Sequence, residues 1–170
     1  MSNDFTALSV GCVDCAREVM LDRFNQLDYY FQRQRITAAY ELWKPKRILV
    51  ELNSIGQPNF EMLQRDGLPV TGFTTTQTSK AALIEAFSLA LETGKVKLLN
   101  DEAGRAELQA YERTTTANGM SRYSAPDGMH DDTVIARALM YRVMSETNPG
   151  VQVRINRLRQ DYQPLKQIFG

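Results

Sequence analysis

Acidic residues stand at two places in the chain where they could bind a divalent metal ion. Glu51 closes the apolar run of residues 48–50, and Asp131 and Asp132 open an expected helix after residues 128–130. Carboxylates at a strand end and at a helix start suit Mg²⁺ or Mn²⁺, and such ions support phosphodiester hydrolysis. The pattern therefore indicates a metal-dependent hydrolase, whose site would usually include a third carboxylate.

Each of these carboxylates also has a structural interpretation. Glu51 follows a strand whose apolar centre suggests burial on both faces, so it needs a metal ion or a basic partner unless the chain reaches solvent there. An aspartate at a helix start caps the helix and complements its dipole, and one residue is enough for that role. Neighbouring helical side chains point about 100° apart. At most one of Asp131 and Asp132 therefore sits ideally for a shared ion, and the other could bind a second ion, support the first or cap the helix.

Two further residues accompany the carboxylates. His130 could bind metal, shuttle a proton or donate a hydrogen bond, and the pattern alone favours the hydrogen bond. Lys80 lies in the first turn of an expected helix, where the helix dipole disfavours a cation. That placement gives Lys80 a phosphate-facing interpretation, which competes with an ordinary role in a polar capping loop.

Cys12 and Cys15 form a C-x-x-C motif, which occurs in redox pairs and in zinc sites. A tetrahedral zinc site needs four ligands, and the single His of the chain is more than a hundred residues away. The motif lies where a turn should join two strands, and no helix follows that would lower the pKa of a thiol. We therefore expect a hairpin turn with neither metal nor redox function.

The composition fits one globular domain. The 170 residues, 43% of them hydrophobic, can bury a substantial core but are too few for two ordinary domains. Because 20 basic and 20 acidic side chains cancel, any contact with DNA must come from a local patch and should be salt-sensitive. No apolar run approaches the roughly 20 residues of a membrane span, and the N-terminal residues do not resemble a signal peptide. We therefore expect a cytoplasmic protein with no membrane partner.

The hydrophobic pattern predicts the following elements in the first half of the chain. They are an antiparallel hairpin over 5–13 and 17–24, a helix over 28–43, a strand over 46–51, a loop over 53–56, a helix over 59–65 and a strand over 69–74. A helix then begins at Thr78 or Ser79, carries an apolar face and ends at Gly94.

The second half is predicted to contain a strand over 96–99, a helix over 101–111, a turn at 118–119 with a small hairpin or extended return over 120–123, and a helix from 131 to about 148. Hairpin strands followed by strand–helix alternation predict an α/β fold, with a mixed sheet between helices on both faces. Functional groups collect at strand ends in such sheets, which suits Glu51. Residues 149–170 are polar and basic, and are expected to extend beyond a domain of residues 1–148.

Four segments together resemble the nuclease domain of tailed-phage large terminase subunits, over about residues 4–144. They are DFTAL at 4–8, VELNSIG at 50–56, TTT and SK at 74–80, and GMHDD at 128–132. The resemblance implies an RNase H-like fold that holds Mg²⁺ or Mn²⁺, with two ions in a complete site, and cuts double-stranded concatemeric DNA inside the host cell. It also implies three partners: the terminase ATPase domain, the small terminase subunit and the portal.

By the same resemblance, Glu51 is the second metal-binding carboxylate and the Asp131–Asp132 pair supplies the last one. His130, Lys80 and Asn53 then become auxiliary residues near the substrate. Asp4 matches an auxiliary acidic position, since the family's first catalytic Asp ends an earlier strand in a Gly-x-Asp-like context. The domain is therefore expected to be N-terminally incomplete.

Two functions stay open from the sequence. One is a metal-dependent endonuclease module without its motor, because the chain has no G-x-x-x-x-G-K-[ST] motif for ATP. The other is a truncated, catalytically silent terminase fragment, of phage or prophage origin, that keeps the fold and could bind DNA or packaging partners. A resolvase or transposase of the RNase H-like class fits the His-Asp-Asp helix and the strand end at Glu51 less well.

Overall fold

The computed structural model describes residues 5–115 and 121–147. Within them the strands form three two-stranded sheets. These are β1 (Thr6–Cys12) antiparallel to β2 (Arg17–Phe24), β3 (Ile48–Glu51) parallel to β4 (Val70–Phe73), and β5 (Glu112–Thr115) antiparallel to β6 (Ser121–Ser124). The predicted hairpin and the two predicted strands around residues 46–51 and 69–74 are confirmed.

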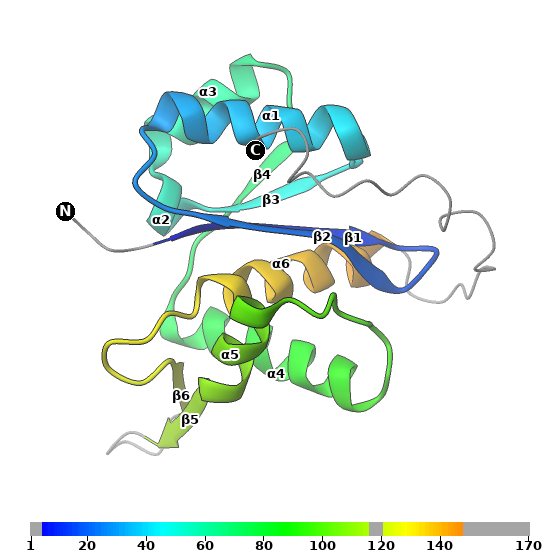
Figure 1. Ribbon diagram of the computed structural model, residues 1–170, viewed down its shortest axis with the longest axis vertical. Coiled ribbons are helices and arrows are strands. Elements are labelled where there is room, and N and C mark those ends of the chain that lie inside the picture. The colour runs from blue at the N-terminus through cyan, green and yellow to red at the C-terminus, as the bar shows by residue number, and fades with distance from the viewer. Residues whose placement is uncertain (1–4, 116–120, 148–170) are drawn as a thin grey trace.

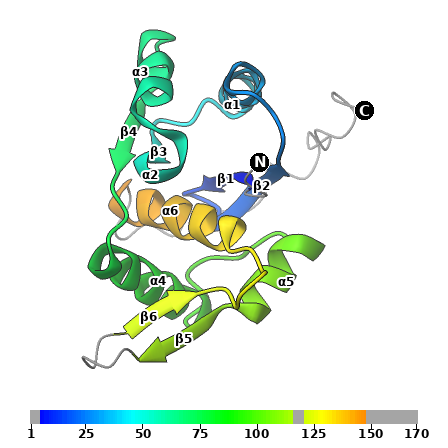
Figure 2. The same cartoon turned by 90° about the vertical axis from the view of Figure 1, so that its left-hand side faces the viewer.

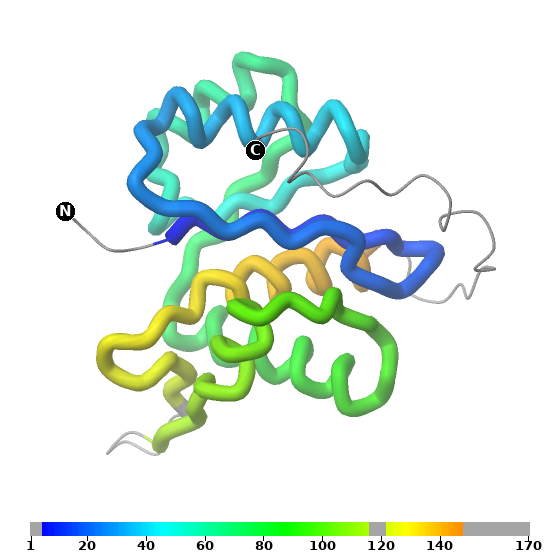
Figure 3. The backbone as a smooth tube through the Cα atoms, viewed as in Figure 1, coloured from blue at the N-terminus to red at the C-terminus, as the bar shows by residue number. Residues whose placement is uncertain are grey.

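Helices cover both sides of β1–β4, as Figure 1 shows. On one side lie α1 (Tyr29–Trp43) and α3 (Gln57–Arg65), and on the other lie α4 (Gln77–Glu92), α5 (Glu102–Ala110) and α6 (Asp132–Thr147). The chain completes the α1–α3 side before it crosses from β4 to α4 (Figure 3). The expected α/β fold, with mixed strand directions and helices on both faces, is therefore confirmed.

Each side has its own apolar core. Ile36 of α1 packs with Phe60, Leu63, Leu68 and Val70 on the first side. The larger cluster on the second side combines Phe73 of β4 and Val96, which follows α4, with the buried faces of α4 and α6: Leu83, Ile84, Phe87, Ala90, Val134, Ile135, Ala138, Leu139, Met140 and Met144. No helix in the described parts of the chain has the length and apolar character needed to span a membrane.

Side-chain caps fix where the helices begin. Asp28 accepts a hydrogen bond from the Phe31 amide at 3.0 Å and starts α1. Thr76, rather than Thr78 or Ser79, starts α4: its hydroxyl accepts from the Ser79 amide at 3.1 Å, while the Ser79 hydroxyl accepts from the Thr76 amide at 2.8 Å. The prediction missed this reciprocal capping box because Ser replaces the usual Glu or Gln.

Two predicted elements were wrong in type. The expected loop at 53–56 begins with a short helix, α2 (Leu52–Ile55), which ends at Gly56 with φ +76°. The expected strand at 96–99 is reduced to a single parallel bridge between Lys97 and Arg17. The ladder stops there because the Leu99 amide donates to the side chain of Glu18, at 3.0 Å, instead of to a neighbouring strand.

The region after α5 also differs from the prediction. The helix ends at Ala110, with Tyr111 in extended conformation, and β5 follows directly and pairs with β6. Of the two predicted alternatives for residues 120–123, the antiparallel pair agrees with the small hairpin, but the prediction did not recognise the partner strand in the polar residues 112–115. The predicted turn at 118–119 and the predicted extension at 149–170 lie outside the described residues.

A groove of about 600 Å³ runs between β1 and β3, with α1 above it and α6 below it. We call it the central groove. Figure 2 shows the β1–β2 and β3–β4 pairs as separate units above α6. Ile48, Leu49 and Val50 line the groove and are half-buried, so the prediction that this strand is buried on both faces was wrong. Its partner on one edge is β4, and no strand in residues 5–115 and 121–147 pairs with its other edge.

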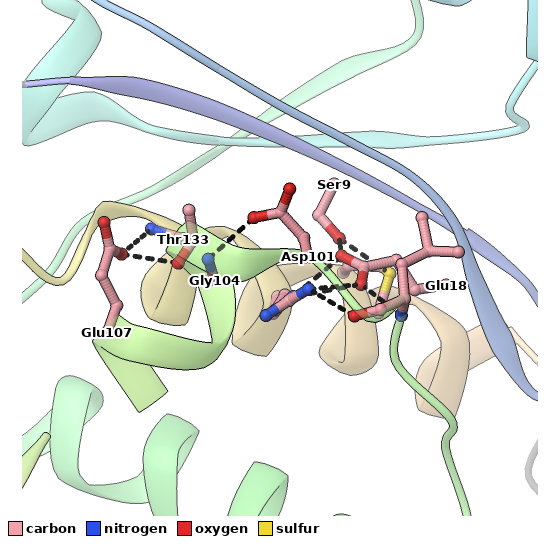
Figure 4. A network of polar contacts seen from close by, with 9 residues as sticks. Ser9, Glu18, Asp101, Gly104, Glu107 and Thr133 are labelled. Atoms are coloured by element: carbon pink, nitrogen blue, oxygen red, sulfur yellow. Dashed lines mark hydrogen bonds and ion pairs between the residues drawn. The ribbon is translucent and has the colours of Figure 1, made fainter. Parts of the chain in front are cut away.

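A buried polar network holds α6 under the strands. Arg137 of α6 is 1% exposed and bonds the equally buried Glu18 of β2, with its Nη2 at 2.9 Å from Oε2. Glu18 also accepts from the Ser9 hydroxyl at 2.7 Å, and Arg137 donates to the Leu99 carbonyl at 3.1 Å (Figure 4). The chain packs tightly here, since a Cβ at Gly104 would collide with the Arg137 guanidinium. These bonds fix the position of α6 relative to β2.

Candidate active site

Four charged residues predicted from the sequence meet at one end of the central groove. Glu51 is the last residue of β3, Asp131 and Asp132 lie at the start of α6, and Lys80 lies near the start of α4. We call this the acidic end of the groove. Three separate elements, β3, α4 and α6, contribute to it. Asp4 lies outside the described residues.

Glu51 is held by hydroxyl groups. Its carboxylate accepts a hydrogen bond from Ser54 at 3.0 Å and another from the Thr75 hydroxyl. Asn53 fixes Thr75 in turn. The side-chain Nδ2 of Asn53 donates to the backbone carbonyl of Thr75, and its Oδ1 accepts from the backbone amide of Thr75, both at 3.1 Å. Within the described residues Glu51 has no ion pair, so its charge is balanced only by these polar contacts.

Asp131 is paired with Lys80, which also lines the groove. The Lys80 ammonium lies 2.9 Å from Asp131 Oδ2, and the two side chains are 24% and 29% exposed. The same ammonium lies 5.8 Å from the centre of the Tyr111 ring. Lys80 therefore neutralises one carboxylate of the site while remaining accessible from the groove.

Asp132 is in a less favourable environment. Its pKa is raised, first by burial and then by the nearby carboxylates of Glu107 and Asp131, although His130 and Arg23 act in the opposite direction. His130 Nδ1 lies 3.6 Å from Asp132 Oδ2, which is too long for a hydrogen bond. The His130 ring instead packs edge-on against Phe5, with 4.9 Å between the ring centres. His130 thus supports Asp132 electrostatically when it is protonated.

Glu107 is a residue of the site that the sequence analysis missed. It is 7% exposed and accepts from the Thr133 amide at 2.8 Å and from the Thr133 hydroxyl at 2.5 Å, as Figure 4 shows. Its other oxygen lies 3.0 Å from Arg23, in an ion pair without hydrogen-bond geometry. Glu107 thereby accepts a hydrogen bond from a backbone amide in the first turn of α6, a role that Asp131 or Asp132 was predicted to have. Its position on the same helix face as Gly104 and Leu108 indicates burial, but it does not indicate the bond to Thr133.

Tyr111 was predicted only as an apolar helix residue. Burial, followed by the charges of Asp131, Tyr123 and Glu51, raises the pKa of its phenol well above the usual range. Its hydroxyl has no hydrogen-bond partner within the described residues. Tyr111 therefore stays protonated near two carboxylates of the site, where it can donate a hydrogen bond.

The residues at the acidic end suit a hard divalent cation in their chemistry. Carboxylate oxygens are the preferred ligands of Mg²⁺, which binds through one or two carboxylates and keeps several waters. In residues 5–115 and 121–147 no three His, Cys, Asp or Glu side chains are grouped closely enough to bind one ion together. The Lys80 ammonium on Asp131 nevertheless shows that one of these carboxylates already has a cation as its partner.

The order of the elements and the position of the carboxylates define an RNase H-like α/β domain. A family model described as the terminase RNaseH-like domain matches residues 2–146, and the chain belongs to this family. The resemblance inferred from the four sequence segments is therefore confirmed. No curated protein matches the chain significantly.

Solved structures agree with this assignment. The large terminase nuclease of thermophilic phage G20c has a TM-score of 0.77 and 26% identity, and the match covers 84% of this chain and 76% of that one. The same nuclease with bound magnesium has a TM-score of 0.76 and 27% identity, covering 83% and 75%. The large terminase nuclease domain of Thermus phage P74-26, at 21% identity, supports the fold alone, with a TM-score of 0.71 and coverage of 89% and 84%.

Proposed function

We propose that the chain is the metal-dependent DNA endonuclease module of a phage packaging terminase, and that it cuts concatemeric viral DNA. The observation that carries the proposal is the convergence of Glu51, Asp131 and Asp132 on one end of the central groove. Membership of the terminase family and the magnesium-bound relative support it. The proposed cation is Mg²⁺ or Mn²⁺, because all three side chains offer hard oxygen ligands.

The proposed roles follow from the contacts. Glu51, Asp131 and Asp132 hold the cation, with Ser54 and Thr75 orienting Glu51. A bound ion would activate water for attack on the phosphodiester and neutralise the developing charge.

Auxiliary residues complete the proposed site. Lys80 would leave Asp131 and contact a DNA phosphate, since its ammonium faces the groove and is partly exposed. Tyr111 would donate a hydrogen bond to a group bound at the site, since its phenol has no partner in the part of the chain that the structure describes. Asn53 keeps Thr75 against Glu51, and His130 limits the repulsion at Asp132.

The proposed setting is that of a terminase. The substrate is double-stranded DNA, and the partners are the terminase ATPase domain, the small terminase subunit and the portal, in the cytoplasm of the host cell. Because the net charge is zero, binding to DNA depends on local groups such as Lys80 and should weaken steeply with salt.

Plasmid cleavage with Mn²⁺ tests the proposal. Glu51→Gln and Asp132→Asn should each lower the cleavage rate by at least about 100-fold, because each removes a charged ligand without changing side-chain size. Glu61→Gln is the matched control: Glu61 is an exposed residue of α3 that does not line the central groove, and its variant should cleave at the parent rate. Cleavage retained in both site variants would overturn the assignment of these ligands.

A second candidate function is a catalytically silent fragment that keeps the fold and binds DNA or packaging partners. It is favoured by the lack of any three-ligand metal group in the described residues. Calorimetry with Mn²⁺ discriminates between the two. Measurable Mn²⁺ binding that Asp131→Asn and Glu51→Gln abolish supports the nuclease, whereas no binding by this chain, together with binding by a longer chain, supports the silent fragment.

A further inference from the structure

The first turn of α6 is capped by a residue of another helix. The Ile135 amide donates to the Asp131 carbonyl at 3.0 Å, which makes Asp131 the N-cap of α6. The side chain of an aspartate in that position usually accepts a hydrogen bond from the amide two or three residues later. Here the amide two residues later, that of Thr133, donates to Glu107 of α5 at 2.8 Å. Glu107 therefore takes the place of the Asp131 side chain as the cap.

This exchange directs the carboxylate of Asp131 to the groove. Asp131 Oδ2 lies 2.9 Å from the Lys80 ammonium. Both Asp131 and Asp132 line the central groove, whereas neither Thr133 nor Glu107 does. An Asp131 carboxylate that accepted the Thr133 amide would be directed at the backbone of α6 and away from Lys80. Capping by Glu107 thus leaves two neighbouring carboxylates facing the same groove.

Glu107 is fixed in place from two sides. One of its carboxylate oxygens accepts from the Thr133 amide and, at 2.5 Å, from the Thr133 hydroxyl. Its other oxygen lies 3.0 Å from Arg23 of β2, whose guanidinium stacks over Phe5 at 3.4 Å from the ring centre. Both Glu107 and Thr133 are buried, as the close view in Figure 4 illustrates. A buried carboxylate is costly unless it is paired and hydrogen-bonded, and Glu107 meets both conditions.

The packing of α5 against α6 brings Glu107 to the start of α6. One turn before Glu107 on α5, a Cβ at Gly104 would collide with the guanidinium of Arg137. Gly104 therefore lies opposite Arg137, and Glu107 lies opposite Thr133. Since the residue numbers rise on α5 as they fall on α6, the two helices run antiparallel. This register determines which residue of α5 can cap α6.

Glu107 also adds negative charge near the proposed ligands. Its charge is one of the causes that raise the pKa of Asp132, after burial. A neutral acceptor could bond Thr133 without that repulsion, although it would not pair with Arg23. The repulsion opposes folding of the protein without a metal ion, and a divalent cation at the acidic end would offset it.

We infer that Glu107 is a positioning residue of the proposed nuclease site. By capping α6 in place of Asp131, it keeps the carboxylates of Asp131 and Asp132 directed into the groove, where they can bind a divalent cation. The inference rests on the proposed function for the cation, whereas the cap itself is a property of the fold. Because Glu107 does not line the groove, it acts through Thr133 and not on the substrate.

A crystal structure of Glu107→Ala tests the cap without any metal ion. The Thr133 amide loses its acceptor, so the Asp131 carboxylate should rotate to accept it, at about 3.0 Å, and leave Lys80. An Asp131 carboxylate that stays on Lys80 in this variant would overturn the inference, whether or not the chain cleaves DNA.

Calorimetry with Mn²⁺ measures the consequence for the cation. Glu107→Ala should bind Mn²⁺ at least about tenfold more weakly than the parent, because residues that orient metal ligands typically contribute that much to metal affinity. Glu107→Gln can still accept the Thr133 amide, so it should recover part of the loss. Raising the Mn²⁺ concentration should restore most of the cleavage rate of Glu107→Ala, since no ligand has been removed.

Asp28→Ala is the matched control. Asp28 caps α1 by accepting the Phe31 amide, and it does not line the groove. This variant should lower the melting temperature, as Glu107→Ala does, but should bind Mn²⁺ as tightly as the parent. Equal Mn²⁺ affinity in Glu107→Ala and the parent would overturn the inference and leave the proposed function intact. A parent that binds no Mn²⁺ would overturn the proposed function, and with it the role of Glu107.

Discussion

Glu18 is more deeply buried than any carboxylate at the acidic end of the groove, yet it is the better satisfied. Its two oxygens receive hydrogen bonds from Ser9, the Leu99 amide and Arg137. Asp132, by contrast, faces other carboxylates and has only His130 and Arg23 as favourable charges, while its side chain is 24% exposed. Burial alone therefore does not distinguish a functional carboxylate from a structural one.

The Glu18–Arg137 network and the acidic end of the groove differ in how well their charges are paired. The Glu18–Arg137 network pairs opposite charges and fills their hydrogen-bonding capacity, so it needs nothing from outside the chain. The acidic end holds three carboxylates, of which Asp131 alone has a lysine partner within the described residues, and it opens into a groove. An excess of negative charge at an accessible position is the arrangement expected of a cation site.

Breaking the buried pair should have the largest effect on stability. Arg137→Met leaves the Glu18 charge buried without its counter-ion, and should lower the free energy of unfolding by about 3–5 kcal/mol in urea denaturation. Arg47→Met is the control, because it removes an ion pair with Glu146 in which both side chains are more than a third exposed. That change should cost less than about 1 kcal/mol. Equal losses in the two variants would contradict the comparison.

Neutralising Asp132 should stabilise the protein, whereas breaking the Glu18–Arg137 pair destabilises it. Its pKa is raised above the ordinary aspartate value of 3.8, so without a metal ion its ionisation opposes folding at pH values above the raised pKa. Asp132→Asn should therefore raise the melting temperature at pH 7, and the gain should vanish as the pH falls toward 3.8. Asp131→Asn is the control, and it should show no gain because it loses the Lys80 ion pair. A gain for Asp132→Asn that grows on acidification would contradict the account.

Lys80→Met should separate function from stability. The Lys80–Asp131 pair is partly exposed, so its loss should change the free energy of unfolding by less than about 1 kcal/mol. DNA affinity should fall, and its dependence on salt should become weaker by about one phosphate contact. Lys95→Met, at an exposed position just beyond the other end of α4, should leave both quantities unchanged. Equal loss of DNA affinity in the two variants would show that Lys80 has no specific role.

The smallest effect is expected at the C-x-x-C motif. Burial and the contact with Cys12 raise the pKa of Cys15 to about 11, so thiolate is scarce at neutral pH. The double variant Cys12→Ser with Cys15→Ser should keep the free energy of unfolding within about 0.5 kcal/mol and retain DNA cleavage. Reaction of the parent with a thiol reagent at pH 7 should be slow. Fast labelling, or stoichiometric zinc binding by the parent alone, would contradict the hairpin interpretation.

The sequence predicted most of the elements because their signals are local. The apolar spacing of α1 and α4 and the aspartates at 28 and 101 locate helices without any tertiary information. The polar strand β5 was missed because all four of its residues are exposed and carry no apolar pattern. The half-burial of β3 was missed for another reason: it depends on which edge of the strand is open.

The candidate site likewise contains residues that the local sequence could predict and residues whose roles depend on tertiary contacts. Glu51, Asp131, Asp132 and Lys80 could be selected from residue type and position, and the fold places them along one groove. The roles of Glu107 and Tyr111 depend on contacts between α5 and other elements, so local periodicity could not reveal them. Nor could it show that Lys80 would pair with Asp131, a residue 51 positions away.

Anomalous diffraction from crystals soaked in Mn²⁺ tests the central claim most directly, namely that the acidic end of the groove is a divalent cation site. We expect a manganese peak at the carboxylate of Asp131 together with Glu51 or Asp132, and a Lys80 ammonium that has moved away from Asp131. An intact Lys80–Asp131 pair, with manganese absent from the groove or bound only elsewhere, would contradict it.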